Sequence, residues 1–229
     1  MQDIRSQRRS EREALLAEIE LAGYLTDPLV EDAMMRVPRH LFVPEELEDL
    51  AYEDRPLPIA FEQTISAPHM VAMMTSALQL QPGDKVLEVG TGAGYHAAIL
   101  EHVVGPEGSV TSVEYLPELA QLARDNLAKI DSKVKVVVGD GADGHRDGAP
   151  YDAVLVTCAI PRIPETLMAQ VREGGHLVAP VGITRCSLLA GKLTTGHFHA
   201  DDLGPCLFVN VQGSLAPPKE LPSPSDEEE

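Results

Sequence analysis

The sequence predicts an α/β fold with a mostly parallel, doubly wound sheet, an antiparallel edge and N-terminal helices. Five short apolar runs rich in β-branched residues support this, because the intervals between them are long enough for helices. The runs are KVLEVG, SVTSVEY, VKVVVGDG, YDAVLVTCA and GGHLVAPVG. Two later runs, CSLLAGKL and CLFVNVQG, have no strong helical pattern between them. We expect these two to pair as antiparallel strands at one edge of the sheet.

The residues before the sheet predict two helices and a long connection. Apolar residues recur on one face from about residue 10 to residue 21, which indicates a first helix. Asp27 and Pro28 are typical of the N-cap and first position of a second helix, which we expect to end near residue 37. Four prolines in residues 37–66 predict extended loop with only short helical pieces.

The composition argues against several classes of function. Asp and Glu outnumber Lys and Arg by 36 to 18, which gives a formal charge of −18 and disfavours nucleic acid as a partner. No apolar run is long enough to span a membrane, and the N-terminus lacks the apolar region of a secretory signal. The three cysteines have no metal-type spacing. We therefore expect reduced, buried thiols in a cytoplasmic protein without a metal site.

The strongest chemical motif is VLEVGTGAGY, in which a predicted strand runs into Gly90, Gly92 and Gly94. Glycines at a strand-to-helix turn allow a ligand to approach the backbone closely. Glu114 ends the next predicted strand, where a carboxylate can bind a ribose diol. Glu88 lies inside the first strand, close to the loop, where it can face a cationic group of a ligand.

A third motif, GDG, ends the third predicted strand with Asp140 and Gly141. Ligands of open α/β sheets bind at the carboxyl ends of the strands, so we expect these residues beside the glycine loop. Two carboxylates suit a ribose and the ammonium of a methionine. The loop reads G-x-G-x-G and lacks the phosphate-anchoring third glycine of dinucleotide folds. Together the motifs favour S-adenosylmethionine over NAD as the cofactor.

The stretch EQTISAPHM poses a separate question, because Ser66 stands just before a predicted helix. Serine is a favoured N-cap residue, and Pro68 suits the first helical turn. A capped helix therefore explains the stretch without any chemistry. The alternative is that the Ser66 hydroxyl contacts a substrate.

The chain resembles the protein-L-isoaspartate O-methyltransferases from about Ala22 to Gly182. The motifs that carry the resemblance are VPRHLFVP, AYEDRPLPI, QTISAPHMVAMM, GDGADG and PYDAVLVTCAIPRIPETLMAQVREGGHLVAPVG, in addition to the glycine loop. The resemblance implies a Rossmann-like class I methyltransferase fold that uses S-adenosylmethionine. It implies that Ser66 is catalytic and lies beside the substrate carboxylate, with Ile59 and Ala60 also on the substrate side. The cofactor residues that it implies are Thr64, Ile65, His69, Glu88, Gly90, Gly92, Glu114, Asp140 and Gly141.

Three regions depart from the family pattern, and all three are expected to flank the substrate peptide. Ala60 stands where the family often has glycine. The chain reads FVNVQG from Phe208 to Gly213 where the family typically has a sequence like FVPL. Ile183, Thr184 and Arg185 replace a turn that often contains glutamine. Cofactor use is therefore better supported than substrate identity.

The implied organisation is one methyltransferase domain at residues 1–215. Residues 1–82 hold the N-terminal helices and the substrate-side segment, and residues 83–215 hold the Rossmann-like core. We expect the proline-rich, acidic tail at residues 216–229 to be disordered. The protein is expected to act as a monomer.

The implied reaction is methylation of the free carboxylate of L-isoaspartyl residues in damaged proteins and peptides, which starts repair through a succinimide. A carboxylate with a pKa of about 4 is already ionised at neutral pH, so no general base is required. The alternatives are a related enzyme that methylates an acid in a biosynthetic peptide, and a cofactor-binding protein without turnover. A tRNA methyltransferase on the same fold is disfavoured by the charge.

Overall fold

The computed structural model describes residues 8–183 and 185–217 and contains a seven-stranded sheet in the order β5-β4-β3-β6-β7-β8-β9. Five neighbouring strands are parallel, and β8 and β9 are antiparallel to their neighbours. The strands are β3 (Lys85–Val89), β4 (Ser109–Glu114), β5 (Lys135–Val138), β6 (Tyr151–Val156), β7 (Val171–Gly182), β8 (Cys186–Thr194) and β9 (His197–Cys206). The predicted fold class is confirmed. The tail expected to be disordered lies outside the described residues, apart from residues 216 and 217.

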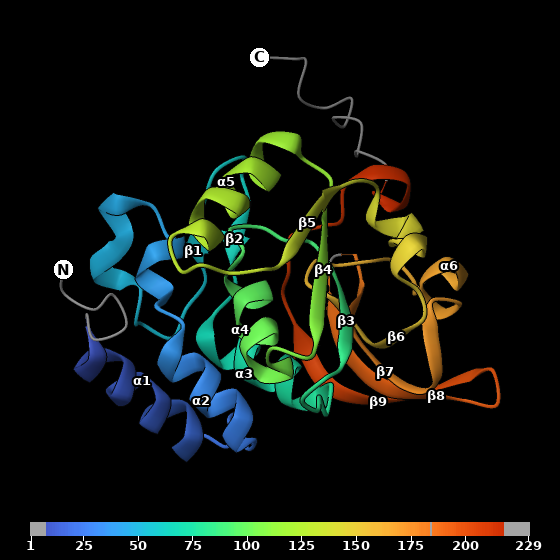
Figure 1. Cartoon of the computed structure of the whole chain (residues 1–229), viewed down its shortest axis with the longest axis horizontal. Helices are drawn as coiled ribbons and strands as arrows, with labels where there is room; N and C mark the ends of the chain where they lie inside the picture. The colour runs from blue at the N-terminus through green and yellow to red at the C-terminus, as the bar shows by residue number, and fades with distance from the viewer. Residues whose placement is uncertain (1–7, 184, 218–229) are drawn as a thin grey trace, which may run out of the picture.

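The two faces of the sheet are covered unequally (Figure 1). One face packs against α3 (Pro68–Ala77), α4 (Tyr95–Val104) and α5 (Pro117–Ala128). The other face is covered by the single turn of α6 (Glu165–Met168), by short 3₁₀ turns and by residues near the C-terminus. Because parallel strands need apolar cover on both sides, β6 is buried from Ala153 to Val156.

The N-terminal helices form an outer layer on the helical face of the sheet. They are α1 (Arg9–Leu21) and α2 (Pro28–Arg36), and α2 contacts both α3 and α4. The predicted cap of α2 is confirmed, because the Asp27 carboxylate accepts a hydrogen bond from the Leu29 N–H at 2.9 Å. The connection to α3 contains η2 (Arg39–Phe42), η3 (Glu45–Leu50) and a small hairpin of β1 (Leu57–Pro58) and β2 (Thr64–Ile65).

The antiparallel edge exists, but its second strand was assigned to the wrong residues. The partner of β8 is His197–Cys206, so CLFVNVQG contributes only its first residue, Cys206, to the strand, and beyond it has an isolated bridge at Asn210. Thr195 and Gly196 have φ angles of 52° and 75°, the left-handed geometry that closes a tight hairpin. Most of β9 is exposed, so its sequence, HFHADDLGPC, lacks the apolar alternation that predicts a strand.

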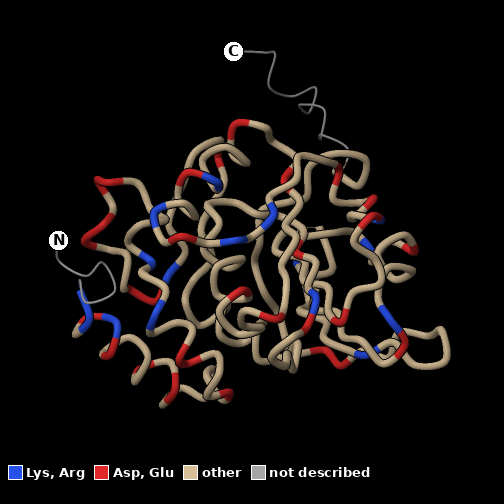
Figure 2. The backbone as a smooth tube through the Cα atoms, viewed as in Figure 1, with Lys and Arg blue, Asp and Glu red and all other residues tan. Residues whose placement is uncertain are grey.

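The acidic residues are spread over helices and loops on all sides of the molecule as seen in Figure 2. Among the described residues, no helix is both long and apolar enough to cross a membrane. The described part of the chain also contains no group of three or more His, Cys, Asp or Glu side chains placed to hold a metal ion.

Candidate active site

A pocket lies at the carboxyl ends of β3, β4 and β6, where the strand order reverses around β3. This reversal separates the loops that follow neighbouring strands and opens a crevice between them. Seven of the predicted site residues line the pocket: Thr64, Ile65, Ser66, Gly90, Gly92, Glu114 and Gly141.

The pocket has two sides that differ in construction. One side, here called the glycine-loop wall, consists of residues 89–93, 113–115 and 157–158, all at or just after strand ends. The other side, here called the outer wall, consists of residues 63–66 and 209–212. These two segments of the outer wall lie far apart in the sequence, because one precedes the first strand of the seven-stranded sheet and the other follows its last strand.

The glycine loop adopts a backbone that only glycine accepts without strain. Gly90, Gly92 and Gly94 have φ angles of 99°, 55° and 93°. A Cβ at Gly90 would collide with the Thr157 hydroxyl, whereas one at Gly92 would meet only Ile59 Cδ1 at 3.8 Å. The space above Gly92 is therefore open to a ligand, which is the close approach that the motif predicts.

Glu114 is the acid of the glycine-loop wall. One of its carboxylate oxygens accepts from the Gly92 N–H at 3.0 Å and the other from the Leu116 N–H at 3.1 Å. The side chain is 6% exposed, and burial raises the pKa of this carboxyl even though the backbone N–H groups oppose the effect. Each carboxylate oxygen has a second acceptor site, so Glu114 can still bind a diol in the pocket.

Glu88 does not line the pocket but lies directly beneath the glycine loop. It is fully buried, and the Ser112 hydroxyl donates to its Oε2, while the Thr91 hydroxyl lies 2.6 Å from that of Ser112. Oε1 has no hydrogen-bond partner among the described residues. Burial raises the pKa of Glu88 to about 8. A buried acceptor without a partner is costly, so this oxygen is a candidate for binding a donor from a ligand.

Asp140 connects the glycine-loop side of the site to the C-terminal residues. Its carboxylate accepts from the Ala142 N–H at 2.9 Å and from the Ser214 N–H at 2.8 Å. Burial by itself would raise the pKa of Asp140, but the backbone hydrogen bonds outweigh it and the pKa is lowered. Gly141 lines the pocket, where a Cβ would collide with Val89. Asp140 itself is not part of the lining.

The helix-cap interpretation of Ser66 is wrong. Helix α3 begins at Pro68, its N-cap is Ala67, and no side chain of the N-cap residue bonds the helix. Ser66 is half-buried and lines the pocket, and its hydroxyl makes no hydrogen bond to the described part of the chain. The acid that caps α3 is instead Asp54, which lies 15 positions before His69 in the sequence. Its carboxylate accepts a hydrogen bond from the His69 backbone N–H at 2.9 Å.

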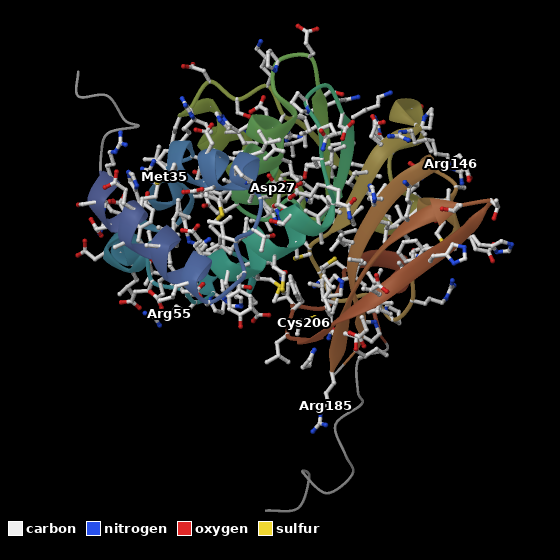
Figure 3. The ribbon with its side chains drawn as sticks, turned by 90° about the horizontal axis from the view of Figure 1, so that it is seen from below. Asp27, Met35, Arg55, Arg146, Arg185 and Cys206 are labelled. Atoms are coloured by element: carbon white, nitrogen blue, oxygen red, sulfur yellow. The ribbon has the colours of Figure 1, made fainter. Side chains whose placement is uncertain are left out.

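The remaining predicted residues, His69, Ile59 and Ala60, are not part of the pocket lining. The His69 ring is 2.9 Å from both carboxylate oxygens of Asp54. Ile59 is buried near Gly92, and Ala60 is exposed at the β1–β2 turn. Thr184 lies outside the described residues. Arg185 is exposed and projects away from the body of the molecule (Figure 3).

The sequence predicts that residues 208–213 flank the substrate peptide, but it does not identify Asn210 and Gln212 individually as the lining residues that they are. The Ala159 N–H donates to the Val209 carbonyl at 2.8 Å, and the Val211 N–H donates to the Ala159 carbonyl at 2.9 Å. These bonds hold the segment against the end of β6. Cys158, which was expected to be only a buried thiol, also lines the pocket. Burial raises its pKa to about 12, so it remains protonated.

These residues fit the cofactor that the sequence motifs favour. The glycine loop leaves backbone accessible beside an acid with free acceptor sites, and the fully buried Glu88 has an oxygen without a partner among the described residues. Leu119 and Tyr115 add apolar surface next to Glu114. Fold and pocket together define a Rossmann-like class I methyltransferase that depends on S-adenosylmethionine.

Comparison with known proteins narrows this class to one family. Residues 10–216 match the family model described as Protein-L-isoaspartate(D-aspartate) O-methyltransferase. A protein-L-isoaspartate O-methyltransferase of Methanopyrus kandleri is 49% identical over 209 residues, which cover 90% of this chain and 92% of the relative. The corresponding protein of Hyperthermus butylicus is 47% identical over 216 residues, with 90% of each chain covered. This chain belongs to the protein-L-isoaspartate(D-aspartate) O-methyltransferase family.

Solved structures agree with the fold. A protein-L-isoaspartate O-methyltransferase with 29% sequence identity superposes with a TM-score of 0.83, covering 90% of this chain and 67% of that chain. A Plasmodium falciparum protein solved in complex with S-adenosyl-L-homocysteine superposes with a TM-score of 0.79 at 23% identity. It covers 88% of this chain and 98% of that chain, and it supports the fold alone.

Proposed function

We propose that this enzyme transfers a methyl group from S-adenosylmethionine to the free carboxylate of L-isoaspartyl residues in damaged proteins and peptides. The observation that carries the proposal is Ser66. This residue lines the pocket within an intact QTIS segment, and its hydroxyl makes no hydrogen bond to the described chain. Family membership indicates the class of substrate, and the Ser66 hydroxyl is the group that would bind the substrate carboxylate.

When bound, S-adenosylmethionine supplies an electrophilic methyl group. Glu114, Gly90 and Gly92 are the residues that would hold the cofactor, with Glu88 below them as an acceptor for its ammonium. The Ser66 hydroxyl would donate to one carboxylate oxygen of the substrate, so that the other oxygen is directed at the methyl group. The enzyme's contribution is then positioning and the exclusion of water.

No residue of the pocket needs to act as a base in this reaction. The acceptor carboxylate is ionised at neutral pH, because its pKa is about 4. His96 is the histidine in the lining, but burial lowers its pKa to about 3 and its Nε2 lies 2.8 Å from the Thr75 hydroxyl. A histidine that is so weak a base and already partnered is poorly suited to removing a proton.

The methyl ester would then react without the enzyme. The neighbouring backbone nitrogen displaces methanol to give a succinimide, and hydrolysis of the succinimide partly restores normal aspartate. The partners that this function implies are proteins and peptides that contain isoaspartyl residues. The three cysteines are free and buried, which supports, but does not test, the expected cytoplasmic location.

The experiment is a pair of peptides that differ only in isoaspartate versus aspartate, incubated with methyl-labelled cofactor. The isoaspartyl peptide should be methylated much faster, because its extra backbone methylene moves the carboxylate relative to Ser66. Equal rates would indicate a broader carboxylate methyltransferase. Activity on neither peptide would favour the biosynthetic-peptide alternative, to which the exposed Asn210 in the lining lends support, or the binding protein without turnover.

A further inference from the structure

Two helices of this chain begin in the same way but are capped differently. Helices α2 and α3 both have proline at the first position, and in both an aspartate accepts from the N–H of the second residue at 2.9 Å. In α2 the aspartate is the N-cap residue itself, Asp27 (Figure 3). In α3 it is Asp54, which lies 15 positions before the residue that it caps.

We propose that Asp54 is a positioning residue for methyl transfer, because it caps α3 from a distance and leaves the Ser66 hydroxyl free for the substrate carboxylate. The inference rests on the proposed function and extends it to a residue outside the pocket. A serine beside a helix start ordinarily bonds an early N–H of the helix. At α3 the His69 N–H is already bonded, so the Ser66 hydroxyl has no such task.

The contact between Asp54 and α3 involves both backbone and side chain. Asp54 Oδ1 accepts from the His69 N–H, and both carboxylate oxygens lie 2.9 Å from the His69 Nδ1. A carboxylate only accepts hydrogen bonds, so Nδ1 is the donor. The His69 ring also packs against Tyr24, with ring centroids 5.0 Å apart. His69 is thus fixed by two elements, and Ser66 is three residues away from it.

The segment that carries Asp54 is itself anchored from the core. The fully buried Arg39 donates through Nε to the Ala51 carbonyl at 2.9 Å and through Nη2 to the Arg55 carbonyl at 3.4 Å. These two carbonyls flank Asp54 on either side. The side chain of Asp54 is 20% exposed and that of His69 is 28% exposed, so water competes only partly for the contact. A chain of contacts therefore runs from the core to His69, which lies three residues after Ser66.

The test combines single and double variants in single-turnover methyl transfer to isoaspartyl peptide. With cofactor saturating, Asp54→Ala should slow transfer at least about fivefold, since small misplacements at a transfer site are costly. The affinity for S-adenosylmethionine should stay within about twofold of the wild type. Asp54→Asn keeps one acceptor oxygen for the His69 N–H, so its transfer rate should lie between those of Asp54→Ala and the wild type. If Asp54→Ala does not fold, the rate of Asp54→Asn provides the test.

Asp27→Ala is the matched control, because it removes the equivalent cap from α2, away from the pocket. It should lower the melting temperature by a few degrees, as expected for a lost cap in a domain of this size, and leave the transfer rate unchanged. If Asp27→Ala slows transfer as much as Asp54→Ala, the effect is general destabilisation and the proposal is wrong.

The double variant Ser66→Ala/Asp54→Ala decides whether Asp54 acts through Ser66. If it does, the double variant should be no slower than the slower single variant, because residues that act as a unit are not additive. Rate losses that multiply would overturn the proposal while leaving the proposed function intact. A wild-type enzyme that does not prefer isoaspartyl peptide would instead refute the proposed function, and the role of Asp54 with it.

Discussion

The two walls of the pocket are held in place by different kinds of contact. The glycine-loop wall consists of strand ends, and its acid, Glu114, bonds the backbone of its own strand end and of the adjacent glycine loop. The outer wall consists of two separate segments, and beside each of them an acid from elsewhere in the sequence bonds a backbone N–H. Asp54 holds the start of α3, and Asp140 holds Ser214, just beyond the C-terminal lining residues. This difference implies that cofactor affinity and acceptor positioning can be changed independently.

The largest expected effect is on the free energy of unfolding, and it concerns Glu88, which lies beneath the glycine-loop wall. Burial raises the pKa of Glu88 from 4.5 to about 8. Between these values the folded protein holds a proton that the unfolded chain releases, so rising pH favours unfolding. Glu88→Gln removes this titration and should be more stable than the wild type at pH 8, with little or none of this gain below pH 4.5. At about 1.4 kcal/mol per pKa unit, the gain is on the order of a few kcal/mol.

Urea unfolding of both proteins across this pH range measures the effect. Glu107→Gln is the control, because Glu107 is exposed and its replacement should not alter the pH dependence. If the difference in free energy of unfolding between Glu88→Gln and the wild type is the same at every pH, Glu88 is ionised in the folded protein and the prediction is wrong.

The next effect concerns cofactor affinity. Glu114→Ala removes the acid of the glycine-loop wall and should weaken S-adenosylmethionine binding by roughly 1–3 kcal/mol, the scale of a lost hydrogen bond to a charged group. Calorimetry measures the change directly. At saturating cofactor, the rate of methyl transfer should fall far less than the affinity. Unchanged affinity would remove Glu114 from the cofactor site.

The smallest effect in free energy concerns the outer wall. Ser66→Ala should bind S-adenosylmethionine nearly as well as the wild type but methylate isoaspartyl peptide at least about tenfold more slowly. Its melting temperature should barely change, since Ser66 does not cap α3. Ser66→Thr keeps the hydroxyl and should be intermediate. Single-turnover assays well below each melting temperature provide the measurement, and a full rate for Ser66→Ala would end the catalytic assignment.

The same comparison explains what the sequence alone could predict. The glycine loop and Glu114 were found because strand, turn and acid lie close together in the chain, and the Asp27 cap was found for the same reason. The local sequence could not decide between a cap and a free hydroxyl at Ser66, because the competing acceptor, Asp54, reaches α3 only through the tertiary fold. Residues 208–213 were expected near the substrate peptide, but Asn210 and Gln212 could not be singled out as lining residues because their location depends on the pairing of this segment with Ala159. Strand β9 was misassigned because a largely exposed strand needs no apolar alternation.

The bridge between Ala159 and residues 209–211 places part of the pocket on a segment that does not belong to the sheet. All seven strands of the sheet end at or before Cys206, whereas the last lining residue of the pocket is Gln212. A chain cut just after Cys206 would thus keep every strand of the sheet but lose Val209, Asn210, Val211 and Gln212 from the pocket lining. Such a truncated chain separates the two properties, because its sheet would be complete while its site would be open on the side of the outer wall.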